Sequence, residues 1–101
     1  MNTSYESVII YNTNLDEAAL DKQIESVEKI IGAHGGSLQK KEVWGKRELA
    51  YHIKKKKFGT YVELHFDGDS GLVSDLERQL NINTQVLRFL NVAKEEESAT
   101  A

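Results

Sequence analysis

The sequence predicts a single α+β domain in which two helices lie on one face of a four-stranded antiparallel sheet. The chain has 101 residues, of which 40% are hydrophobic, and this is enough for one core but too little for two. Its apolar residues change between strand-like and helix-like spacing in the order strand, helix, strand, strand, helix, strand. No internal repeat or linker is visible, so residues 1–93 are interpreted as one domain.

The first strand is expected at Tyr5–Tyr11, which is rich in β-branched and aromatic residues and is followed by a turn-forming run at 12–14. The next apolar residues recur at helical spacings of four, three and four: Leu20, Ile24, Val27 and Ile31. We expect Asn14 to cap this helix, because Glu17 stands three residues later as in a capping box. The glycines between 32 and 36 are expected to end it.

A long or broken second strand is expected at Leu38–Ile53, where the apolar pattern has a period of two. Gly45 interrupts this pattern in the way that a bulge does. Four consecutive lysines, Lys54, Lys55, Lys56 and Lys57, follow. Together with Phe58–Gly59 they predict the tip of a hairpin, because like charges repel one another and need solvent.

The third strand is expected at Thr60–Phe66, with Tyr61, Glu63 and His65 on one of its sides. A turn at 67–71 leads into a second helix, whose apolar stripe is Val73, Leu76 and Leu80. The fourth strand is expected at Gln85–Val92. Residues 94–101 are acidic and small, which predicts a short disordered tail.

This order of elements is that of the ferredoxin-like split βαββαβ fold, with strands one and three in the middle of the sheet. Strand one has apolar residues in both registers, with Ile9 and Tyr11 in one and Val8 and Ile10 in the other. Strand four is similar, with Val86, Leu90 and Val92 alternating against Leu87 and Phe89. A protein partner or a second copy could cover the sheet face without helices, but modest apolar exposure is also common on soluble domains.

The positive charge of the chain is concentrated in one segment. The chain has 13 basic and 16 acidic residues and a net charge of −3, whereas residues 40–57 carry eight cations and two anions, a local charge of +6. Trp44 and Tyr51 are interleaved with these cations. A hairpin of this kind can hold phosphates and stack a base, although a solvated charged hairpin is the alternative. Because the rest of the chain carries −9, we expect weak binding to RNA unless another protein contributes.

Several classes of function are disfavoured by the composition. The chain has no cysteine, and its longest apolar run, Val8–Tyr11, is far too short to span a bilayer, so a soluble cytoplasmic protein without membrane contact is expected. The three histidines, His34, His52 and His65, lack the spacing of a metal site, although His52 and His65 could face each other across a hairpin. No phosphate loop or nucleophile motif is present, so no enzyme, cofactor, metal or small-molecule substrate is predicted.

Three other kinds of protein share this topology. Residues 57–64 approach the aromatic pattern of an RNA recognition motif but fall out of register after Gly59. An acylphosphatase would need an arginine after the first strand, where this chain has Asn12-Thr13-Asn14-Leu15. A small-molecule-binding regulatory domain that oligomerises through its sheet remains open.

The segment Val43–Ile53, VWGKRELAYHI, resembles the WGRRxLAYPI signature of the bacterial small-subunit ribosomal protein six family. Supporting matches, in order along the chain, are Tyr5-Glu6, Asn12-x-Asn14-Leu15, Gly59-x-Tyr61 and Val86-x-Arg88. The resemblance implies a structural component of the bacterial-type small ribosomal subunit. Such a protein binds the central domain of small-subunit ribosomal RNA together with ribosomal protein eighteen of that subunit.

Carried over by position, the resemblance implies RNA contacts for Lys46, Arg47 and Arg88, to which we add the basic tip Lys54–Lys57 as a hypothesis. Residues expected to order the strand or to meet the protein partner are Trp44, Leu49, Tyr51, Tyr61, Val8 and Ile10. The chain departs from the signature at His52, which replaces a proline. It also has Asn2, Thr3 and Ser4 where many members carry arginine.

Overall fold

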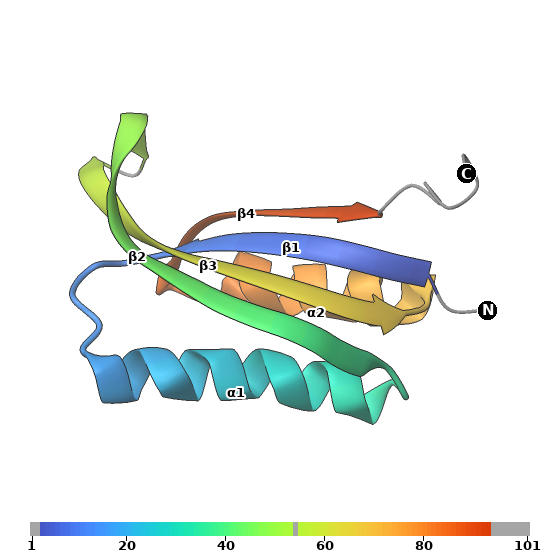
Figure 1. Cartoon of the computed structure of the whole chain (residues 1–101). Coiled ribbons are helices and arrows are strands. Elements are labelled where there is room, and N and C mark those ends of the chain that lie inside the picture. Colours follow the sequence, from blue (N-terminus) through green and yellow to red (C-terminus); the bar gives the residue numbers. More distant parts are fainter. Residues whose placement is uncertain (1–2, 54, 94–101) are drawn as a thin grey trace.

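The computed structural model describes residues 3–53 and 55–93, apart from the side chain of His52. Its elements are β1 (Thr3–Tyr11), α1 (Glu17–Ala33), β2 (Ser37–Ile53), β3 (Lys56–Gly68), α2 (Ser70–Ile82) and β4 (Val86–Ala93). The strands form one antiparallel sheet in the order β2-β3-β1-β4, so the predicted ferredoxin-like arrangement with strands one and three in the middle is confirmed. Figure 1 shows both helices on the same side of the sheet. We call the opposite side, which no described helix covers, the bare face. The tail at 94–101 lies outside the described residues.

The main core fills the space between the sheet and the helices. It consists of Ile9, Tyr11, Ile24, Val27, Ile31, Val62, Leu64, Phe66, Leu72, Leu76, Leu80 and Val86. The predicted stripe of the first helix is confirmed. In the second helix the prediction was partly wrong, because Leu72 is fully buried while Val73 is only half-buried. Leu72, Leu76 and Leu80 recur at a spacing of four on the face of α2 that packs on the sheet, and the half-buried Val73 packs against the same core.

The predicted cap of α1 was also wrong. The helix begins at Glu17, and its N-cap is Asp16, whose carboxylate accepts a hydrogen bond from the backbone N–H of Ala19 at 2.8 Å. The backbone N–H of Asn14 instead donates to the side-chain oxygen of Asn12 at 3.2 Å, so Asn14 belongs to the preceding turn. Aspartate and asparagine are equally good N-cap residues. Because Asn14 is still part of the turn, the helix starts later and Asp16 takes the cap position.

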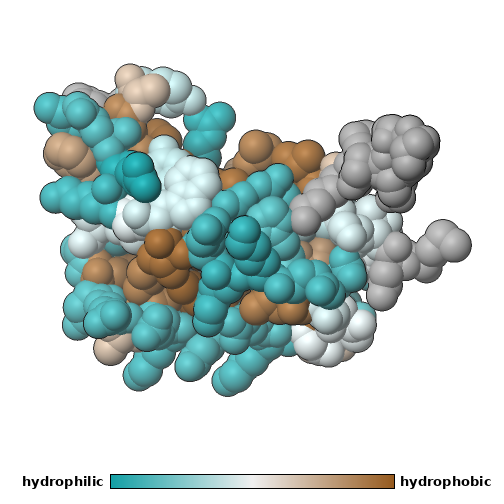
Figure 2. Space-filling view, in the orientation of Figure 1, coloured by the Kyte–Doolittle hydropathy of each residue, from teal (hydrophilic) through white to brown (hydrophobic). Residues whose placement is uncertain are grey.

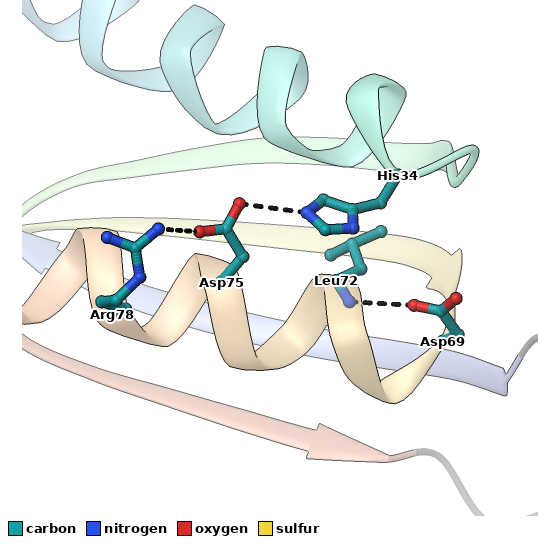
Figure 3. Close-up of polar contacts among 5 residues, drawn as sticks. All are labelled: His34, Asp69, Leu72, Asp75 and Arg78. Carbon is teal, nitrogen blue, oxygen red and sulfur yellow. Dashed lines mark hydrogen bonds and ion pairs between the residues drawn. The ribbon is translucent and has the colours of Figure 1, made fainter.

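A polar contact joins the two helices at one end of the molecule (Figure 3). His34, which follows α1, places its ring Nε2 3.0 Å from the carboxylate of Asp75 on α2. Arg78, one turn further along α2, donates to the other oxygen of the same carboxylate. The hydrogen bond from His34, followed by the contact with Arg78, lowers the pKa of Asp75 from its ordinary value of 3.8. The side chain of Asp69 caps α2 by accepting from the N–H of Leu72 at 2.9 Å.

Strands β2 and β3 extend past the end of β1. The pairing of β1 with β3 ends at Tyr11 and Thr60, so residues 46–53 and 55–59 form a two-stranded ribbon that curls over the bare face (Figure 1, upper left). Gly45 at the base of this ribbon has φ +92° and accompanies a shift in register, which confirms the predicted bulge.

The tip of the ribbon is tighter than predicted. We expected Phe58–Gly59 to lie in the turn, but β3 already begins at Lys56, and Phe58 pairs with Glu48 on β2. Lysine side chains that extend into solvent can avoid one another even within a paired strand, so the run of lysines does not require a long turn. Lys55 has φ +66° at the turn, and Lys54 lies outside the described residues.

A second, smaller apolar cluster fixes the ribbon to the bare face. Leu49 of the ribbon, 6% exposed, packs with Ile10 and Leu87. Gly59 is required where the ribbon crosses β1, because a Cβ atom at this position would collide with the side chain of Ile10. The ribbon is therefore held in place by contacts within the chain.

Candidate nucleic-acid interface

The strand register arranges the bare face in rows that run across β2, β3, β1 and β4. Starting from the end far from the ribbon, the rows are Lys40, His65, Glu6 and Val92; Glu42, Glu63, Val8 and Leu90; and Gly45, Tyr61, Ile10 and Arg88. A further row of Ser37, Asp67 and Ser4 lies beyond the first and does not reach β4. Every row has a carboxylate except the third, which is next to the ribbon. The bare face is thus divided into an acidic, apolar half and a half that adjoins the cationic ribbon.

Arginine side chains lie against aromatic rings beside the ribbon. Trp44 stacks on Tyr61, with ring centroids 6.0 Å apart and an angle of 6° between the planes. The guanidinium group of Arg47 lies 5.9 Å from the ring of Trp44. A planar guanidinium group above a ring keeps its N–H donors free for phosphate oxygens and presents a flat surface to a base.

Arg88 is brought to the ribbon from the far end of the sequence. It donates a hydrogen bond to the hydroxyl group of Tyr51, and its guanidinium carbon lies 5.9 Å from the ring of that tyrosine. Both side chains line a mostly apolar groove of about 190 Å³. The groove is lined by Ile10, Leu49, Ala50, Tyr51, Ile53, Tyr61 and Arg88.

Lysines gather on a third aromatic ring, which the sequence analysis missed. Phe58 is 38% exposed, and the Nζ atoms of Lys46 and Lys57 lie 4.7 and 5.9 Å from its ring centroid. Lys46 and Arg47 are neighbours on a strand and therefore point to opposite sides of the ribbon. The predicted RNA-contacting residues are accordingly spread over both sides of the ribbon. The available signal was the run of lysines that ends at Lys57, directly before Phe58.

The predicted partner residues differ widely in exposure. Trp44 and Tyr51 are exposed, Val8 and Tyr61 are half-buried, and Ile10 and Leu49 are buried within the chain. Ile10 and Leu49 therefore offer little surface to a partner, and Leu49 serves to order the ribbon instead.

Two exposed residues of β4 add apolar surface that the sequence analysis did not assign. Leu90 is 61% and Val92 46% exposed, and both lie on the bare face. Figure 2 shows hydrophobic side chains reaching the surface over β4. The mixed apolar pattern of this strand was the available signal. Its faces could not be assigned, because the register of β4 shifts opposite Ile10 and Tyr11. The shift lets Leu87 pack with Ile10 on the bare face although the next residue, Arg88, lies on the same face.

The predicted encounter of His52 and His65 does not occur. His65 lies opposite Lys40 on β2 and opposite Glu6 on β1, far along the strand from the ribbon. Among the residues that the structure describes, no helix is long and apolar enough to cross a membrane.

The sequence model of the family described as Ribosomal protein S6 matches residues 4–93, a range that includes the ribbon, β4 and the whole bare face. The chain belongs to the ribosomal protein S6 family. Family membership groups the chain with curated proteins that are structural components of the small ribosomal subunit and not enzymes. It favours this interpretation over the small-molecule-binding regulatory domain.

Curated relatives carry the description small ribosomal subunit protein bS6. The protein of Gluconobacter oxydans is 42% identical over 91% of this chain and 58% of its own length. Those of Geobacter sulfurreducens and Heliobacterium modesticaldum are 40% and 38% identical, over 94% and 92% of this chain and 81% and 97% of their own lengths. The chain spans 58 to 64% of the length of the Gluconobacter, Granulibacter and Paramagnetospirillum relatives.

A solved structure supports the fold. The crystal structure of 30S ribosomal protein S6 from Thermotoga maritima superposes with a TM-score of 0.90 at 28% identity, covering 99% of this chain and 94% of that one. An uncharacterized protein of the same organism, with a TM-score of 0.58 at 14% identity, shows only that the fold is shared.

Proposed function

We propose that this protein binds the central domain of small-subunit ribosomal RNA together with ribosomal protein eighteen of the small subunit. In this proposal the ribbon and Arg88 contact the RNA, while the acidic, apolar half of the bare face docks the protein. The observation that carries the proposal is the separation of these two surfaces along a single sheet face.

The chemistry at the ribbon suits a structured RNA. Arg47 and Arg88 each lie near an aromatic ring, so part of the entropic cost of ordering them is met before RNA binds. Their guanidinium groups can contact phosphate oxygens in a bidentate manner, and the exposed rings of Trp44 and Tyr51 can stack on unpaired bases. The exposed lysines of the tip act as point charges and add affinity without reading sequence.

The charge of the rest of the molecule favours joint binding. Outside residues 40–57 the chain carries −9, which opposes approach to a polyanion. A partner with cationic and apolar side chains would neutralise Glu6, Glu42 and Glu63 and cover Leu90 and Val92. The pair would then present less negative charge to RNA than the single chain does.

Filter binding to a central-domain RNA fragment over a range of salt concentrations, with and without protein eighteen, tests the RNA surface. We expect weak binding of the chain alone and much tighter binding of the pair. In the pair, Arg47→Ala with Arg88→Ala should weaken binding at least about tenfold and reduce the salt slope by about one for each lost phosphate contact. Lys29→Ala is the control for lost charge, because Lys29 is exposed on α1.

Three results would contradict the proposal. Tight binding of the chain alone at physiological salt would show that no partner is needed. The arginine variant removes two charges and Lys29→Ala removes one, so an equal loss of binding free energy per removed charge would mean that only total charge matters. An unchanged arginine variant would remove the ribbon from the interface.

A further inference from the structure

Three side chains with metal-binding groups converge on the bare face, away from the ribbon. Glu63 and His65 are two residues apart on β3 and so point to the same side, and Glu6 on β1 lies directly opposite His65. His65 Nε2 lies 3.2 Å from a carboxylate oxygen of Glu63 and 3.8 Å from one of Glu6. One ligand atom from each residue lies within 4.8 Å of the other two.

These distances fit a small tetrahedral cation. Zinc binds nitrogen and oxygen ligands at about 2.0–2.2 Å, which puts neighbouring ligand atoms of a tetrahedron roughly 3.3–3.6 Å apart. The separations of 3.2 and 3.8 Å lie on either side of this range, so only small side-chain movements are needed. Imidazole together with carboxylate suits zinc, whereas magnesium and calcium prefer oxygen ligands alone.

The site also has a surplus of negative charge. The side chains of Glu63 and His65 are only 12% and 16% exposed, and that of Glu6 is 39% exposed. A neutral imidazole has one N–H, so Nε2 can donate to one of the two carboxylates but cannot neutralise both. Glu42, opposite Glu63, adds a further carboxylate.

Among the described residues, no lysine or arginine forms an ion pair with Glu6 or Glu63. Lys40 lies opposite His65 on β2, but within residues 3–53 and 55–93 no lysine or arginine nitrogen lies within 4.0 Å of the carboxylate of Glu6 or Glu63. A divalent cation would neutralise both carboxylates at once and would use the lone pair of His65.

We propose that Glu6, Glu63 and His65 form a zinc(II) site on the bare face, with His65 Nε2 and one oxygen of each carboxylate as ligands and water as the fourth. Bound zinc would link β1 to β3, the two central strands, and thereby stabilise the fold. The site shares Glu6 and Glu63 with the half of the bare face that the proposed function assigns to the protein partner, and it shares no residue with the RNA surface. Its test uses the chain alone, so failure of the zinc site and failure of the proposed function can be distinguished.

The test uses the untagged full chain after removal of metal with a chelator. Calorimetric titration with zinc chloride at neutral pH should show one ion bound per chain, and zinc should raise the thermal unfolding midpoint while equal magnesium does not. Cobalt(II) should give the intense visible absorption of a tetrahedral complex. His65→Gln and Glu63→Gln should each weaken zinc binding at least about tenfold, because each removes a ligand.

His34→Gln is the matched control, since His34 also lies beside a carboxylate, that of Asp75, but on the side of the helices. It should bind zinc as the unmodified chain does. If His65→Gln or Glu63→Gln fails to fold, zinc binding is measured on Glu6→Gln instead, because Glu6 is the most exposed ligand. Circular dichroism confirms that this variant is folded. The proposal fails if the unmodified chain does not bind one zinc ion, if binding survives loss of His65 or Glu6, or if His34→Gln weakens it equally.

Discussion

At the scale of single residues, the glycines show how local sterics place the ribbon on the bare face. Gly59 lies where β3 crosses the side chain of Ile10, and no side chain fits there. The sequence indicated a glycine in a turn at this position, but the structure has a glycine within a strand. The difference arises because close contact between two distant segments can require glycine just as a turn does.

Gly59→Ala should therefore destabilise the protein. The added methyl group must displace Ile10 or lift the ribbon, which typically costs about 1–3 kcal/mol in free energy of unfolding. Gly32→Ala is the control, because a Cβ atom at Gly32 meets nothing within 4 Å and alanine favours a helix. Urea unfolding should show a small stabilisation for the control, and equal effects of the two substitutions would exclude a steric role for Gly59.

At the scale of elements, the contact between α1 and α2 has a dependence on pH that can be worked out. The pKa of Asp75 is lowered in the folded state, so its contact with His34 contributes stability at pH values above the unfolded pKa near 3.8. This contribution is lost as the pH falls through the lower folded pKa.

Asp75→Asn should consequently reduce the free energy of unfolding at neutral pH, and the difference from the unmodified chain should shrink below about pH 4. Chemical denaturation at a series of pH values measures this difference. A difference that stays constant into strong acid would mean that the charge of Asp75 has no role in joining the helices.

The ribbon is the second element whose behaviour can be predicted. Leu49 packs on Ile10 and Leu87 and is the only ribbon residue in that buried cluster among the described residues. Leu49→Ala should cost about 2–4 kcal/mol and should speed hydrogen exchange in residues 46–59 more than in the main core. Tyr51→Phe removes only the hydroxyl group that accepts from Arg88 and should leave exchange in the ribbon almost unchanged.

At the scale of the whole molecule, the order of elements and the middle strands were predictable, because hydrophobic periodicity and crossover handedness are local signals. The division of the bare face was not predictable. It depends on the registers between strands that are distant in the sequence. The unbroken pairing of β1 with β3 sets Glu6 beside His65 and Glu63, and the pairing of β4 with β1, which has a shift opposite Ile10, places Leu90. The cluster of Glu6, Glu63 and His65 was missed for the same reason, since its members are far apart in the sequence.

The most direct test of the two-surface account is the affinity of the chain for protein eighteen, measured by calorimetry without RNA. Leu90→Asp should weaken this affinity at least about tenfold by placing a charge in the docking surface. Ile82→Asp is the matched control, because Ile82 is 67% exposed, close to the 61% of Leu90, but lies on α2. Unchanged affinity with Ile82→Asp and a large loss with Leu90→Asp are predicted. Equal losses, or no loss with Leu90→Asp, would contradict docking on the bare face.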